Sequence, residues 1–145
     1  MRDIRSNDPT GIHRTFVEAD GSGKDAGARD RAKMMLGRSK GSVVKLTPDD
    51  HIATGLAIAE GIETALSCMT VGWPTWACLS SAGIAAFPVL GGIEALTIFA
   101  DHDQSRAGEE AAIECGIRWR DSGAEVCIIK PRAEGKDWND VLKVA

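Results

Sequence analysis

The chain has 145 residues, which is about one domain's length and enough to bury a sizeable core. Its hydrophobic content of 43% is ordinary for a soluble globular protein, and no apolar run approaches the roughly 20 residues that a membrane-spanning helix needs. The formal net charge is -4, and the first residues, MRDIRSNDPTG, lack the apolar stretch of a signal peptide, so we expect a cytoplasmic protein that does not enter a membrane.

The first part of the chain, residues 1–50, is polar and rich in glycine. The alternating segment HRTFVEADGSG predicts a strand that runs into a turn, and SVVKL predicts a second strand. Between them a short helix is expected around residues 28–36. This part is therefore interpreted as a small irregular or β-rich N-terminal arm.

From residue 51 onward, short apolar runs alternate with segments of helical periodicity. The expected elements are, in chain order, a strand at 55–60, a helix at 61–72, a strand at 75–80, a helix at 81–87, a strand at 94–100, a helix at 105–123, a strand at 124–130 and a helix at 138–145. Apolar strands joined through helices are typical of a parallel sheet covered on both faces. We therefore expect an α/β domain over residues 51–145, with a four-stranded, mainly parallel sheet flanked by helices.

The four cysteines predict buried thiols and no metal site. Cys68, Cys78, Cys115 and Cys127 lie in apolar surroundings, without a Cys-x-x-Cys pair and without histidines at zinc-ligand spacing. We expect them to carry no chemistry.

The arm is basic, although the whole chain is acidic. Residues 1–50 hold 10 Lys and Arg against 8 Asp and Glu, whereas residues 51–145 hold 7 against 13. A local excess of positive charge suits a polyanion. The candidate nucleic-acid-binding residues are Arg29, Arg31, Lys33 and Arg38. A solvated charged arm without a binding role stays open as the alternative.

Three carboxylates follow the ends of two predicted strands. Glu60 ends the strand at 55–60, and Asp101 and Asp103 follow the strand at 94–100. Ligands bind at the carboxyl ends of the strands in an open parallel sheet, so these side chains are expected at one edge, with His102 pointing away. Carboxylates at such a short distance repel each other unless a cation lies between them. Carboxylate oxygens are ligands that Mg²⁺ accepts. The pattern therefore predicts a divalent metal site.

Further charged residues fall near the same edge. Arg106 lies in the first turn of the helix at 105–123, where free N–H groups suit an anion, although an ion pair with a glutamate three or four residues later is the alternative. Lys136 and Asp137 follow the last predicted strand, and Asp137 is alternatively a helix cap. Glu63 is interpreted as an ordinary acid in the first turn of a helix.

Three phrases in this order resemble the TOPRIM domain, which DnaG-type primases, topoisomerases and gyrases, OLD-family nucleases and RecR-type proteins share. The phrases are AEGIETAL, ADHDQSRAG and GKDWNDVL, which contain Glu60, the pair Asp101 and Asp103, and Asp137. The resemblance covers about residues 55–145 and is closest to primase-like TOPRIM proteins of phages, prophages and plasmids. It implies a Rossmann-like fold, with residues 1–50 as a basic arm or the end of an upstream primase subdomain.

The resemblance also implies a function, namely metal-dependent nucleotidyl transfer on DNA, and most directly primer synthesis in DNA replication. Glu60, Asp101 and Asp103 would be catalytic and, with Asp137, would bind Mg²⁺ or Mn²⁺, Glu60 acting as a ligand or general base. Arg106 and Lys136 would steady phosphates. The implied partners are a single-stranded DNA template, ribonucleoside triphosphates and, as a further partner, a replicative helicase.

Two other functions remain open. One is a metal-dependent TOPRIM nuclease, but the chain has no tyrosine and so cannot itself supply the tyrosyl nucleophile of a topoisomerase. The other is a non-enzymatic DNA-binding accessory module. It is favoured because the zinc-binding module and further core residues that such primases commonly carry have no counterpart here. The chain therefore resembles a fragment or a partnered subunit, which need not be active alone.

Overall fold

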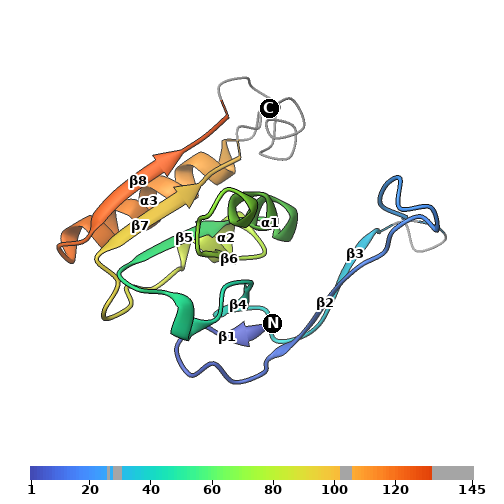
Figure 1. Ribbon diagram of the computed structural model, residues 1–145, viewed down its shortest axis with the longest axis horizontal. Helices are drawn as coiled ribbons and strands as arrows, with labels where there is room; N and C mark the ends of the chain where they lie inside the picture. Colours follow the sequence, from blue (N-terminus) through green and yellow to red (C-terminus); the bar gives the residue numbers. More distant parts are fainter. Residues whose placement is uncertain (26, 28–30, 102–105, 132–145) are drawn as a thin grey trace.

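A computed structural model of the chain describes residues 1–25, 27, 31–101 and 106–131. In this part of the chain, six strands form the main sheet in the order β1-β4-β6-β5-β7-β8, and β2 and β3 form a second, two-stranded sheet (Figure 1). The strands are β1 (Arg2–Asp3), β2 (Gly11–Thr15), β3 (Lys33–Gly37), β4 (Ser42–Lys45), β5 (Gly55–Ala59), β6 (Thr75–Ala77), β7 (Ala95–Phe99) and β8 (Glu125–Ile129). The helices are the 3-10 turn η2 (Asp49–His51), α1 (Ile62–Thr70), α2 (Ser81–Ala85) and α3 (Ala107–Asp121).

The predicted α/β architecture is confirmed. Strands β6, β5, β7 and β8 are parallel neighbours, and helices connect them in the expected alternation. Each of these strands and helices lies within its predicted range, and its ends differ from the predicted ends by at most three residues. The helix expected at 138–145 lies outside the described residues.

Helices cover the central strands of the parallel sheet on both faces, and alternate side chains of β5 show how. Leu56 and Ile58 belong to a core that also contains residues of α2 and α3, whereas Ala57 and Ala59 pack in a second core with Ala65 of α1. Because a strand presents successive side chains to opposite faces, a strand buried on both sides must be apolar at every position. That is why the run at 55–59 shows no polar alternation.

The arm is β-rich, as expected, and two of its strands extend the main sheet. β4 runs antiparallel to β6, with Val44 opposite Ala77, and β1 pairs with β4. The sheet therefore continues beyond the four strands predicted from residues 51–145.

The short helix predicted around residues 28–36 is wrong where the structure describes it, because Lys33–Gly37 is strand β3. This strand pairs with β2 in an antiparallel register from Gly11 opposite Gly37 to Thr15 opposite Lys33. A helix this short is costly to nucleate, whereas the hairpin satisfies the backbone groups of residues 33–37 through pairing. The two glycines allow a close approach, since a Cβ on Gly11 would lie 2.2 Å from the carbonyl oxygen of Leu36.

The prediction of buried thiols holds for Cys68, Cys78 and Cys115 but is wrong for Cys127, which is exposed. Cys127 lies on β8 opposite Thr97, on the face of the sheet where α1 packs mainly against β5 and β6. All four thiols are free. Within the described ranges, no helix combines the length and the apolar character needed to cross a bilayer.

Candidate functional site

The site lies where the order of the parallel strands changes direction. From β5 the chain passes through α1 to β6 on one side, and then returns through α2 to β7 on the other side of β5. Ligands of open α/β sheets bind at the carboxyl ends of the strands beside such a switch point. Glu60 directly follows β5, and Asp101 follows the end of β7 by two residues.

Glu60 and Asp101 line one cleft of about 270 Å³. Its walls are formed by Lys24, Lys33, Glu60, Gly61, Glu63, Thr64, Leu79 and Asp101. The first turn of α3 lies close to both acidic residues. A Cβ placed on Gly108 would lie 3.9 Å from Oε2 of Glu60 and 3.6 Å from the backbone nitrogen of Asp101, so both acidic residues pack around the same point of the helix.

Four other predicted site residues lie outside the described residues. They are the metal ligands Asp103 and Asp137, the phosphate-binding residue Lys136, and Arg29 of the arm. Within the described ranges, no group of three His, Cys, Asp or Glu side chains is arranged to hold a metal ion.

The chemistry of the two placed carboxylates nevertheless suits a hard divalent cation. Proteins usually hold Mg²⁺ through one or two carboxylates, while water and substrate phosphates complete the coordination. Glu60 and Asp101 provide two carboxylates, and the cleft that they line also contains the ammonium groups of Lys24 and Lys33. The residues present therefore fit such an ion.

Glu63 contacts two lysines that are distant in sequence. Lys33 Nζ donates a hydrogen bond to Glu63 Oε2 at 2.9 Å, and Lys24 Nζ lies 3.1 Å from Oε1. Burial acts to raise the pKa of Glu63, but the hydrogen bonds from Lys33, the backbone and Lys24 outweigh it and hold the pKa at about 2. Glu63 is therefore ionised at neutral pH. Its place in a first helical turn was predictable, but its partners were not, because they lie 30 or more residues earlier in the chain.

Leu79 lines the cleft and has an unusual backbone conformation. Its φ of 72° lies in the left-handed region, which a bulky residue rarely adopts. The N–H of Leu79 donates to the carbonyl oxygen of Glu60 at 2.8 Å, and the N–H of Cys78 donates to that of Ala59 at the same distance. These bonds tie the segment after β6 to the end of β5 and hold the strained conformation in place.

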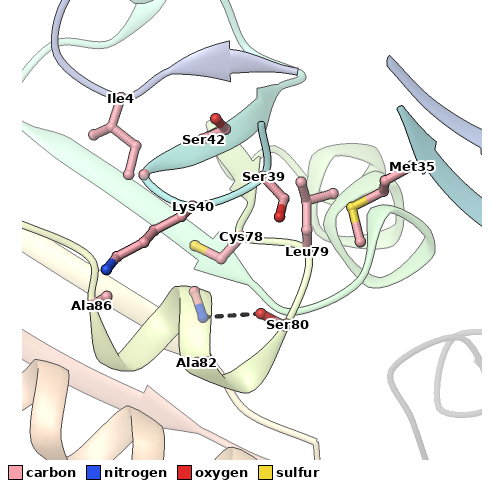
Figure 2. A pocket seen from close by; sticks show the side chains of 12 residues that line it. Ile4, Met35, Ser39, Lys40, Ser42, Cys78, Leu79, Ser80, Ala82 and Ala86 are labelled. Carbon is pink, nitrogen blue, oxygen red and sulfur yellow. Dashed lines mark hydrogen bonds between the residues drawn. The ribbon is translucent and has the colours of Figure 1, made fainter. Parts of the chain in front are cut away.

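A second hollow of about 410 Å³ lies on the other side of Leu79 (Figure 2). It is lined by Ile4, Met35, Ser39, Lys40, Gly41, Ser42, Cys78, Leu79, Ser80, Ala82, Gly83 and Ala86. In Figure 2 the side chain of Lys40 extends toward Ala86, and the side chain of Cys78 lies between those of Lys40 and Leu79. Burial raises the pKa of the Cys78 thiol far above its usual range, so Cys78 is a neutral apolar wall and not a nucleophile.

Several predicted anion-binding residues already have carboxylate partners. Nε of Arg106 lies 3.8 Å from Glu109, the ion pair considered as the alternative, and the Arg106 side chain is 66% exposed. Arg38 pairs with Asp3 at 2.8 Å, and Lys33 pairs with Glu63. Arg31 is exposed.

Comparison with known proteins gives the family and the fold. A family model described as "Toprim domain" matches residues 55–145. A search of curated proteins finds no match. Among solved structures, the chain is similar to a DNA primase domain from Pseudomonas aeruginosa, with a TM-score of 0.59 and 12% sequence identity. The superposition covers 99% of this chain and 51% of that one, so the chain spans about half of the primase domain. With the family model matching from β5 to the last residue, this chain belongs to the Toprim domain family.

Proposed function

We propose that the chain is the Toprim part of a DNA primase and takes part in metal-dependent nucleotidyl transfer that synthesises primers. The observation that carries the proposal is the cleft at the carboxyl ends of β5 and β7, in which the carboxylates of Glu60 and Asp101 lie beside two lysines. This arrangement combines oxygen ligands for a cation with positive charge for phosphates.

Divalent metal ions are generally bound by Toprim domains. Here Glu60 and Asp101 would hold Mg²⁺ or Mn²⁺, with Asp103 and Asp137 as further ligands from outside the described residues. The ion, when bound, neutralises phosphate charge and lowers the pKa of an attacking hydroxyl.

The reaction proposed is attack of the 3′-hydroxyl oxygen of one nucleotide on the α-phosphate of a ribonucleoside triphosphate, with pyrophosphate leaving. The hydroxyl proton must be accepted during the attack, and Glu60 serves as a metal ligand or as that acceptor. Arg106 and Lys136 are proposed to steady phosphates. The arm residues Arg29, Arg31 and Arg38 are proposed to contact the single-stranded template.

The partners follow from the same proposal. They are single-stranded DNA, ribonucleoside triphosphates and, in a replicating cell, a replicative helicase in the cytoplasm. The chain spans about half of the primase domain that it resembles, so activity should be tested on a longer natural form as well as on this chain.

The test compares wild type with Glu60→Gln in the incorporation of labelled ribonucleotides into short oligomers on a single-stranded template. Glu60→Gln should abolish synthesis and leave DNA affinity nearly unchanged, since it alters the cleft and not the arm. In calorimetry, Glu60→Gln combined with Asp101→Asn should lose Mn²⁺ binding. The control is Glu114→Gln, which removes a carboxylate from α3 that is 69% exposed and outside the cleft.

The other outcomes separate the remaining functions. Equal Mn²⁺ binding by wild type and the double variant would remove the site assignment. Metal-dependent degradation of the template by the longer form, without oligomer synthesis, would indicate a nuclease. Absence of both activities in both forms would indicate an accessory module.

A further inference from the structure

The cleft contains a contact between the N-terminal arm and α1 that the acidic motifs do not explain. Lys24 belongs to the segment that connects β2 and β3, and Lys33 begins β3. Lys24 contacts Oε1 of Glu63 and Lys33 contacts Oε2. The lysine side chains are 50% and 41% exposed, and that of Glu63 is 29% exposed. The three residues line the same cleft as Glu60 and Asp101.

The net charge of the cleft depends on whether a cation is bound. Three carboxylates and two ammonium groups line it, and a divalent cation between Glu60 and Asp101 would make the total positive. The cleft then presents three cationic centres around about 270 Å³. Lysine ammonium groups on flexible stems bind phosphate as mobile point charges, so they can leave one anionic partner for another.

We propose that Lys24 and Lys33 form a polyphosphate-binding subsite, in which Glu63 is the resting counterion that the phosphates of a nucleoside triphosphate replace. This inference rests on the proposed function, since it names residues that receive the substrate's phosphates. It assigns Lys33 to the nucleotide and not to the template, and it adds Lys24, which no motif indicated.

Electrostatics gives the direction of each effect. Partly exposed ion pairs such as those of Glu63 contribute little to stability, so a polyanion can displace the carboxylate at small cost. Removing Glu63 takes a negative charge away from the place where the phosphates bind and should leave affinity equal or higher. Removing the lysines deletes charge-assisted hydrogen bonds to phosphate and should lower affinity.

The experiment is calorimetric titration of the full chain with inorganic triphosphate in the presence of Mg²⁺. Lys24→Gln with Lys33→Gln should weaken binding about tenfold or more. Glu63→Gln should bind as tightly as wild type or more tightly. Lys24→Arg with Lys33→Arg keeps both charges and should retain most of the affinity.

The matched control is Arg5→Gln with Lys40→Gln. It removes two positive charges from the same N-terminal arm, and both residues are exposed. Neither residue lines the cleft. This control should weaken triphosphate binding by no more than about threefold, because only long-range charge is lost. Thermal unfolding of each variant establishes that it is folded before its binding is compared.

Two results would overturn the inference. One is a loss of affinity in the lysine variant no larger than in the control. The other is a loss in Glu63→Gln as large as in the lysine variant, which would make Glu63 part of the binding site and not a displaced counterion. Either result, together with intact Mn²⁺ binding and primer synthesis, leaves the proposed function standing. Lysine-dependent triphosphate binding without primer synthesis supports the subsite and contradicts the proposed function.

Discussion

At the scale of single residues, the left-handed backbone of Leu79 is the clearest departure from ordinary local structure. Its φ of 72° is unfavourable for any residue with a Cβ, and glycine is the residue that adopts it freely. A leucine at this position indicates that its side chain, which lines both the cleft and the neighbouring hollow, contributes enough to offset the strain.

Replacing Leu79 by glycine and by alanine tests this strain directly. Both changes remove the side chain beyond Cβ, so the difference between the two variants reports mainly the cost of a Cβ at this backbone conformation. Leu79→Gly should be more stable than Leu79→Ala by about 1 kcal/mol in urea unfolding, because glycine has no Cβ to clash.

The control for this pair is Leu66, an exposed residue in the middle of α1. There the order should reverse, with alanine more stable than glycine by about 1 kcal/mol, because alanine favours the helix. If Leu79→Ala were the more stable variant at position 79 as well, the strain at this residue would be absent in solution.

At the scale of elements, the packing of α2 sets the position of the segment that carries Leu79. Ser80 caps α2 by accepting a hydrogen bond from the N–H of Gly83 at 3.0 Å. The guanidinium of Arg118 on α3 donates to the carbonyl oxygens of Ala85 and Phe87 at the other end of α2. Phe87 also stacks on Trp119 of α3, with ring centroids 6.0 Å apart, so α2 is held at both ends.

Gly83→Ala should disturb this arrangement. A Cβ on Gly83 would lie 2.2 Å from the carbonyl oxygen of Cys78, and a backbone atom cannot move aside cheaply. We expect a loss of about 1–3 kcal/mol in the free energy of unfolding, although alanine normally favours a helix.

Gly91→Ala is the matched change, since nothing lies within 4 Å of a Cβ at that position and it is exposed. It should alter stability by no more than about 0.5 kcal/mol. Equal stability of the two alanine variants in chemical unfolding would contradict the close packing of α2 on the end of β6.

At the scale of the whole molecule, positive charge gathers in the arm although the chain carries a net charge of -4. The hairpin of β2 and β3 extends away from the main sheet in Figure 1, and Lys33, at the end of the paired strands next to the connecting loop, lines the cleft. Under the proposed function, a basic projection beside this cleft is a suitable place for a nucleic-acid strand.

Replacing Arg29, Arg31, Lys33 and Arg38 with alanine should therefore weaken binding to a single-stranded oligonucleotide. Counterion release makes such binding salt-dependent, so the slope of log K against log salt concentration should become shallower by up to about 2 for the three lost template contacts of Arg29, Arg31 and Arg38, since Lys33 is assigned to the nucleotide. Arg120→Ala on α3 is the control and should change neither the affinity nor the slope. Unchanged affinity in the quadruple variant would indicate that the arm is a solvated charged surface without a role in binding.

The sequence by itself determined the α/β architecture and the place of the acidic residues. Apolar runs such as residues 55–59, followed by helical periodicity, are local patterns, and parallel strands joined through helices align their carboxyl ends. Glu60 and Asp101 could therefore be assigned to one edge of the sheet without coordinates. In the structure both line one cleft, in agreement with that assignment.

Only the tertiary structure decided the features that depend on distant pairing. Residues 33–37 have strand partners 18 to 26 residues earlier, and Lys24 and Lys33 meet Glu63 across 30 residues or more, so no local pattern indicates either contact. The exposure of Cys127 likewise depends on which strands α1 covers. Such contacts form because burial and hydrogen bonding of separate segments outweigh the entropy of closing the loops between them, and that balance is decided by the whole fold.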